Sequence, residues 1–183
     1  YNILGTVNTI FISISVYGVY LQLKTVWKNK ENQQVLSSKG KATAVLSLNQ
    51  IFVSFLAYFS FFIYGYSIEP FNHFIVWPRL FATVIVATLL YEIWRDRKDH
   101  LSLTIFTLAS AILCLGLIGG VFGASYQDES KTISTILMLV ISALIAQGYY
   151  HQFILILKSG QTGAVNLRTS QFIFAMDIST IAF

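Results

Sequence analysis

The chain has 183 residues, of which 55% are hydrophobic and 11% are charged, and its formal net charge is +4. Soluble domains carry about 25% charged residues, so this composition excludes an ordinary soluble globule. It favours a protein whose helices cross a lipid bilayer, which takes about 20 mostly apolar residues per helix. The apolar runs of the sequence are therefore the predicted transmembrane helices.

Five apolar runs are long enough to cross a bilayer, and a sixth is shorter. In chain order they cover residues 3–23, 44–66, 74–94, 101–123, 133–157 and 169–183. No short, basic, cleavable leader precedes the first run, so we expect it to be a transmembrane helix and not a signal peptide. The sixth run has 15 residues and ends on apolar side chains, so we expect the native protein to continue.

The basic residues indicate the orientation, because Lys and Arg accumulate in cytoplasmic loops during membrane insertion. Ten of the twelve lie in the first, third and fifth loops, namely Lys24, Lys28, Lys30, Lys39, Lys41, Arg95, Arg97, Lys98, Lys158 and Arg168. Of the other two, Lys131 lies in the fourth loop and Arg79 inside the third helix. We therefore expect the N-terminus outside and loops one, three and five in the cytoplasm. A basic patch can also bind nucleic acid, but orientation explains these residues, so no nucleic-acid partner is predicted.

The first and fifth apolar runs carry the same polar pattern, 130 positions apart. The matching residues are Gly18, Tyr20, Gln22 and Lys28 in the first copy and Gly148, Tyr150, Gln152 and Lys158 in the second. This internal repeat indicates two copies of one membrane-embedded unit. Duplicated units of this kind are typical of transporters, whose substrate site lies near the bilayer midplane between the copies.

These features predict an all-α integral membrane protein with two parallel three-helix repeats. Loops one and five lie on the same side, and direct fusion of two three-helix units would invert the second, so a single linking helix is needed. The predicted 3+1+3 arrangement has a first unit at residues 1–95, a linker at 101–123 and a second unit at 133–183 whose last helix lies beyond the sequence. The linker contains Gly116 and Gly119, each with a glycine four residues later. These spacings either allow close helix packing or reflect the glycine content of membrane helices.

The arrangement resembles the PQ-loop and SWEET (MtN3/saliva) superfamily of small-solute transporters. In that family a Pro-Gln pair lies near the cytoplasmic end of the first helix of each unit, followed by a basic, polar loop. Here the pairs are Leu21-Gln22 and His151-Gln152, so both glutamines are present and both prolines are absent, and residues 158–168 are similar to the family's loop. The resemblance implies alternating access for a small polar solute such as a sugar, an amino acid or a carboxylate.

Two charged residues lie inside predicted helices, where a central charge costs about 2.5–3.5 kcal/mol on insertion scales. Asp177 is nine positions into the sixth helix, and Arg79 is six positions into the third. Asp177 either exchanges a proton during transport or is the ionic partner of a cation such as Arg79. Arg79 either binds an anionic solute or extends to the outer interface beside Trp77. A pair of fixed opposite charges suits a zwitterion or a carboxylate better than a neutral sugar.

Amide side chains form a second set of candidates, because they both donate and accept hydrogen bonds. Gln22 and Gln152 occupy matching positions, and we expect them to cap backbone groups near a helix end rather than contact the solute. Gln50 and Gln171 join Asp177 and Arg79 as candidates for the solute or proton site.

Motifs for other classes of function are absent from the sequence. Cys114 is its single cysteine, and no glycine-rich phosphate loop, metal-binding His-Glu motif or nucleophile elbow occurs. The charged residues at 92–99 are predicted to form a solvated cytoplasmic turn rather than a catalytic site. We therefore predict no enzyme activity, no cofactor and no metal, but a bilayer-embedded transporter of a small polar solute, with or without proton coupling. A receptor or membrane-anchored partner protein of the same fold is the alternative, and a homo-oligomer remains open.

Overall fold

The computed structural model describes residues 2–36, 42–67, 73–122, 132–160, 165 and 171–173. Its long elements are α1 (Asn2–Leu36), α2 (Leu48–Ser67), α3 (His73–Arg97), α4 (His100–Phe122) and α5 (Thr132–Ser159). Each of these five helices contains a stretch that is long and apolar enough to cross a membrane. The predicted apolar helices of membrane-spanning length are thus confirmed for the described part of the chain.

α1 is longer than its apolar run. The run ends at Leu23, but the helix continues to Leu36 through a polar stretch that contains three Lys, two Gln and one Glu, which are good helix formers. Lys30 Nζ on this stretch lies 2.6 Å from Glu92 Oε2 on α3, so the polar part of α1 is also held against the bundle. Hydropathy therefore predicts the membrane-crossing part of α1 but not where the helix ends.

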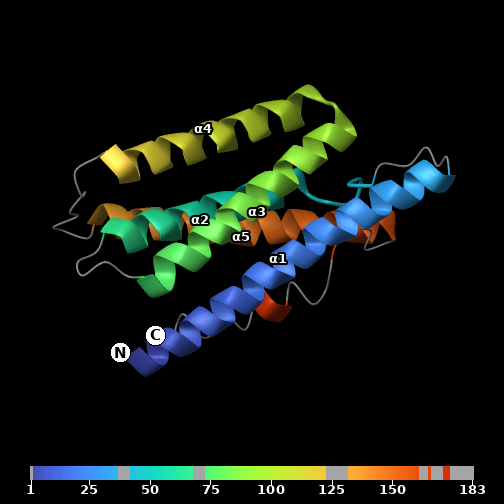
Figure 1. Ribbon diagram of the computed structural model, residues 1–183. Helices are drawn as coiled ribbons and strands as arrows, with labels where there is room; N and C mark the ends of the chain where they lie inside the picture. Colours follow the sequence, from blue (N-terminus) through green and yellow to red (C-terminus); the bar gives the residue numbers. More distant parts are fainter. Residues whose placement is uncertain are drawn as a thin grey trace.

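α3 lies between α1 and α2 and packs against both of them. α5 packs against α2, and α4 packs against α2 and α3. Figure 1 shows α1, α3 and α5 running in one direction and α2 and α4 in the other. The carboxyl ends of α1, α3 and α5 therefore share one end of the bundle. We call it the basic end, since Arg95, Arg97 and Lys158 lie in the last turns of α3 and α5.

Apolar side chains from α1 to α4 form one core around α3. Its members include Val19, Leu23 and Val26 of α1, Phe55 and Tyr58 of α2, Leu89, Leu90 and Ile93 of α3, and Ala109 of α4. Many large apolar side chains of α4 and α5 instead point outward, as Leu115 (70% exposed) and Leu139 (67% exposed) do. Outward apolar surface of this kind is what a helix bundle surrounded by lipid requires.

Gly116 and Gly119 of the predicted linker differ in their surroundings. A Cβ added at Gly116 would lie 2.4 Å from Phe59 Cζ, so this glycine allows α4 to approach α2 closely. A Cβ added at Gly119 would meet nothing within 4 Å. Close packing therefore explains Gly116, whereas Gly119 has no such role.

The second repeat unit is described through α5 and the short helical piece at residues 171–173. The rest of the predicted sixth helix (169–183), Asp177 included, lies outside the described residues. The first unit and the linker correspond to α1–α3 and α4. α1 and α5 run in the same direction, as parallel repeats require, but the full 3+1+3 relation stays a prediction.

Candidate functional site

The repeated motif places its small and amide residues inside the bundle and its tyrosines outside. The inward residues are Gly18, Gln22, Gly148 and Gln152. Tyr20 and Tyr150 are 40% and 68% exposed. This follows from helix geometry, because residues four apart share a face while residues two apart lie on opposite sides. The motif therefore marks a packing face of α1 and α5, and its tyrosines do not line an internal site.

Gln152 of α5 binds backbone groups just before α2. Its side-chain Oε1 accepts a hydrogen bond from the Ser47 amide (2.6 Å), and its Nε2 donates to the Val45 carbonyl oxygen (2.8 Å). α5 can come this close because Gly148 has no side chain: a Cβ there would lie 3.2 Å from the Gln50 Cα. Gln152 thus caps the backbone at the start of α2, as the structural interpretation of the repeated glutamines predicts. The matching role of Gln22 stays a prediction.

The start of α2 is a capping box completed from α5. Ser47 is the N-cap, since its Oγ accepts a hydrogen bond from the Gln50 amide (3.1 Å). In the usual Ser-x-x-Gln box, the Gln side chain returns to the amide of the cap residue. Here Gln50 Nε2 donates to Ser54 Oγ (3.1 Å), and the amide of Ser47 is bound by Gln152 instead. The predicted start of the second helix at residue 44 is therefore wrong, because the helix begins after this cap.

The segment before α2, residues 42–47, is held from α3 as well; we call it the α2-entry segment. Asp96 Oδ2 accepts hydrogen bonds from the Thr43 amide (2.8 Å) and hydroxyl (2.7 Å). Arg97 Nη2 donates to the carbonyl oxygens of Thr43 (2.6 Å) and Leu46 (2.5 Å). The segment lies between two sets of polar side chains, one from α3 and one from α5.

Three residues of the charged segment 92–99 are thus integral to the packing. Glu92 is 5% exposed and bound by Lys30, while Asp96 and Arg97 are partly buried against the α2-entry segment. The prediction of a solvated turn is wrong for these residues. The reason is that Asp96 and Arg97 bind the unpaired backbone groups of a neighbouring segment, whereas Glu92 forms an ion pair with Lys30 of α1.

Two more hydrogen bonds join α5 to the start of α2. The Ser47 hydroxyl lies 2.7 Å from His151 Nδ1, and Asn49 Nδ2 donates to Gln147 Oε1 (2.6 Å). The Gln147, His151 and Gln152 side chains therefore bind the same short stretch, residues 45–49. Together they form a polar contact between α5 and the start of α2 at the basic end.

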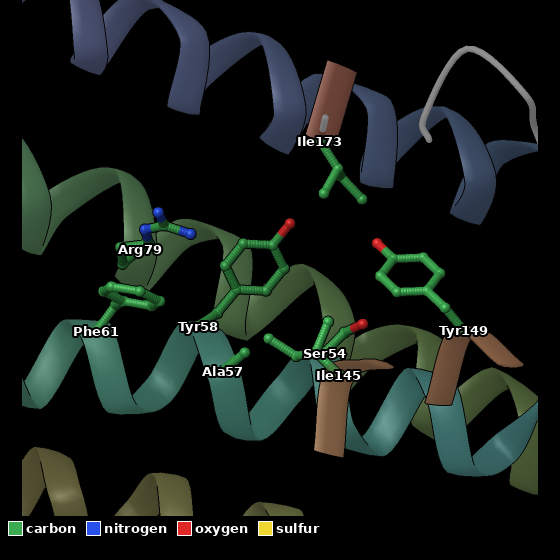
Figure 2. A pocket seen from close by; sticks show the side chains of 8 residues that line it. All are labelled: Ser54, Ala57, Tyr58, Phe61, Arg79, Ile145, Tyr149 and Ile173. Carbon is green, nitrogen blue, oxygen red and sulfur yellow. The ribbon is translucent and has the colours of Figure 1, made fainter. Parts of the chain in front are cut away.

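A cavity of about 60 Å³ lies further along the same helices. It is lined by Ser54, Ala57, Tyr58 and Phe61 of α2, Arg79 of α3, Ile145 and Tyr149 of α5, and Ile173 (Figure 2). Ala57 and Ile145 lie within one residue of the midpoints of α2 and α5. The cavity therefore lies near the middle of α2 and α5 and near the start of α3, with walls from both predicted units.

Arg79 is the charged residue among the described residues that line this cavity. It is 3% exposed, and its guanidinium carbon lies 4.5 Å from the ring centroid of Phe61 and 5.5 Å from that of Tyr58. Such cation–π contacts contribute about 0.5–2 kcal/mol each and help to hold a cation away from water. The alternative in which Arg79 extends to the outer interface with Trp77 is wrong. Trp77 is 50% exposed, and residues two apart on a helix point to different sides.

The other predicted site residues lie around the cavity rather than in it. Gln50 is one turn before Ser54, to which it donates a hydrogen bond. Gln171 is exposed and precedes Ile173, a wall residue, by two positions. Asp177 lies outside the described residues, so its pairing with Arg79 stays a prediction.

Sequence reasoning missed the hydroxyl groups of the cavity. They belong to Ser54, Tyr58 and Tyr149. Ser54 and Tyr58 are four residues apart on α2, which places them on one face, and this spacing was visible in the sequence. Tyr149 could not be distinguished from the outward Tyr150 without knowing which side of α5 meets α2.

The composition of the cavity defines what it can bind. One cation, three hydroxyls and aromatic rings suit a small solute with an anionic or hydroxyl group. Within the described residues, no group of three His, Cys, Asp or Glu side chains could hold a metal ion. Comparison with family models, with curated proteins and with solved structures found no match. Function is therefore inferred from the cavity and from the packing around it.

Proposed function

We propose that the protein is a multi-pass membrane transporter that moves a small polar solute by alternating access. The observation that carries this proposal is the position of the cavity. Its walls come from α2 and α3 of the first predicted unit and from α5 and Ile173 of the second, near the middle of α2 and α5. A polar site between two units can open to either side when the units tilt against each other.

The contacts at the basic end fit this mechanism. Gln152 and His151 on α5 bind the α2-entry segment, so these hydrogen bonds join the two units on one side of the cavity. In an alternating-access cycle, they would form in the state closed at the basic end and break in the state open there. The two units would need no proline for this movement, because the hydrogen bonds themselves can be exchanged for water.

The orientation in the membrane is part of the proposal. Arg95, Arg97 and Lys158 at the basic end of the bundle support a cytoplasmic location for that end. The N-terminus of α1 would then face outward. The resemblance of the sequence to the PQ-loop and SWEET superfamily and the predicted 3+1+3 arrangement agree with a transporter, and the common direction of α1 and α5 is compatible with it.

Flux measurements on the purified protein in proteoliposomes test the proposal. Ala57→Leu would extend a side chain into the cavity, so we expect uptake of any transported solute to fall at least several-fold. Ala111→Leu is the matched control, because Ala111 is exposed on α4 and makes no part of the cavity. Binding of a solute without flux would indicate a receptor instead. Equal flux through both variants would contradict transport through this cavity.

A further inference from the structure

The outward face of α3 changes from apolar to basic along its length. From Trp77 onward, its exposed residues are Trp77, Phe81, Val84, Tyr91, Arg95 and, directly after the helix, Lys98. They follow one another at spacings of three, four or seven, which places the helical ones on one face. Figure 1 shows α3 between α1 and α4, which pack against α3 but, within the described residues, not against each other. Neither helix therefore covers this face, which we call the α3 outer face.

Aromatic rings mark the level of the membrane interface on the α3 outer face. The ring centroid of Phe106 on α4 lies 5.4 Å from that of Tyr91 and 5.7 Å from that of Trp94, with the Trp94 and Phe106 rings stacked. Tyr and Trp concentrate where the hydrocarbon of a bilayer meets the headgroups. This cluster therefore puts Arg95, one turn after Tyr91, at the depth of the lipid headgroups.

The apolar part of the face has the length of one lipid leaflet. Val84 lies 11 residues before Arg95, which corresponds to about 16 Å along a helix. A hydrocarbon core of about 30 Å gives each leaflet about 15 Å. A lipid whose headgroup is at Arg95 would therefore extend its acyl chains along Tyr91 as far as Val84.

Arg95 carries a positive charge that its neighbours do not cancel. Its Nη1 lies 3.5 Å from Glu92 Oε1, but Glu92 Oε2 is already bound by Lys30 Nζ at 2.6 Å. Two cations thus share one carboxylate, and 58% of the Arg95 side chain is exposed. The planar fork of a guanidinium matches the oxygens of a phosphate, so this end of the face suits an anionic headgroup.

Lys98 adds a second positive charge at a position where the backbone favours glycine. Its φ is +53°, in the left-handed region in which helices commonly end on glycine. The carboxylate next to it, that of Asp99, is bound by the Ser102 amide and hydroxyl. Independently of transport, we propose that the α3 outer face binds one anionic phospholipid of the leaflet at the basic end. Its phosphate would lie at Arg95 and Lys98, and its acyl chains along Tyr91 and Val84.

Three probes test the two parts of such a ligand. Native mass spectrometry of the purified protein in detergent gives dissociation constants for dioleoylphosphatidylglycerol, dioleoylphosphatidylcholine and glycerol 3-phosphate. We expect phosphatidylglycerol to bind at least about tenfold more tightly than phosphatidylcholine, because each Lys or Arg near a headgroup contributes about fivefold. Glycerol 3-phosphate lacks acyl chains and should bind at least about tenfold more weakly than phosphatidylglycerol. Equal affinity for the two lipids would overturn the proposal, and glycerol 3-phosphate binding as tight as that of phosphatidylglycerol would replace it with a site for free phosphate.

Variants locate the site on α3. Arg95→Gln should lower the preference for phosphatidylglycerol over phosphatidylcholine about fivefold, and Arg95→Lys should restore part of it. Lys98→Gly should lower the preference similarly while it relaxes the backbone, so it keeps the proposal testable if Arg95→Gln does not fold.

Lys158→Gln is the matched control for these variants. Lys158 is exposed at the same end of the bundle, but its helix α5 does not pack against α3 in the described part of the chain. The preference should then change by less than about twofold. An effect as large as that of Arg95→Gln would show attraction to the whole basic end and overturn a site on α3. Solute flux is not measured here, so either result leaves the transport proposal standing.

Discussion

The first turn of α2 and its middle both carry polar side chains, but for different physical reasons. At the start of a helix the backbone amides have no partner within the helix, so other groups must bind them. Ser47 and Gln152 do this for α2, and Asp96 and Arg97 bind the α2-entry segment just before it. In the apolar interior of a membrane protein such backbone groups are costly to leave unpaired.

In the middle of α2 the backbone is already hydrogen-bonded within the helix. The Ser54 and Tyr58 side chains are therefore not needed to satisfy it, yet they share a cavity with Arg79 and Tyr149. Polar side chains at the middle of an apolar helix are costly, and such residues are often functional. The comparison separates residues that hold α3 and α5 against the start of α2 from residues that line the cavity.

The largest loss of stability should come from substitution of Gln152, the residue of α5 that binds the start of α2. Gln152→Leu would leave the Ser47 amide and the Val45 carbonyl without this partner, so we expect a loss of about 2–4 kcal/mol of unfolding free energy. Tyr150→Leu on the exposed side of the same helix should change it by less than about 0.5 kcal/mol. Denaturant unfolding in detergent measures both. Equal effects would show that the hydrogen bonds of Gln152 contribute nothing to stability.

A smaller effect distinguishes the start of α2 from its middle. Ser47→Ala removes an N-cap and should cost about 1 kcal/mol. Ser54→Ala, seven residues later, exchanges one hydrogen bond from Gln50 for a better helix former, so the net change should stay within about 0.5 kcal/mol. Thermal unfolding of the two variants under the same conditions gives the difference. A larger loss for Ser54→Ala would assign the middle of α2 a structural role too.

The membrane-spanning helices follow from the sequence because long apolar runs are a strong signal. The repeat motif also has predictive value, since the spacing of Gly148 and Gln152 puts them on one face. The capping box from Ser47 to Gln50 was present in the sequence and predicts the start of α2, but an apolar run that begins at residue 44 obscures it.

The cavity could not be derived in the same way. Which face of α5 meets α2 depends on the packing of the whole bundle, so Tyr149 and Tyr150 are equivalent in sequence and different in space. The direction of Arg79 was ambiguous for a related reason. A long cationic side chain near a helix end can extend to water or turn inward, and here the rings of Phe61 and Tyr58 favour the inward direction.

The smallest predicted effect concerns α4. The start of α4 is capped by a residue next to it in the chain, whereas a residue of another helix completes the cap of α2. Asp99 Oδ2 accepts a hydrogen bond from the Ser102 amide (3.4 Å), and its Oδ1 accepts one from the Ser102 hydroxyl. These bonds hold the pKa of Asp99 below its ordinary value of 3.8. A depressed carboxyl pKa means that the folded state gains stability above the unfolded value and loses it as the pH falls through the folded value.

We therefore expect the unfolding temperature in detergent to drop below about pH 4 by a small amount that Asp99→Asn removes. Asp99 is exposed, so solvent screening keeps this effect below those at Gln152 and Ser47. Asp96→Asn is the informative comparison, because Asp96 binds the Thr43 amide and hydroxyl of the α2-entry segment. Losing its charge should weaken the contact between α3 and that segment at neutral pH as well. Asp99→Asn should therefore lower stability at pH 7 less than Asp96→Asn does. Equal losses would show that the cap of α4 by Asp99 contributes as much stability as the contact between α3 and the α2-entry segment. The difference between local caps and contacts from other helices would then not hold for α4.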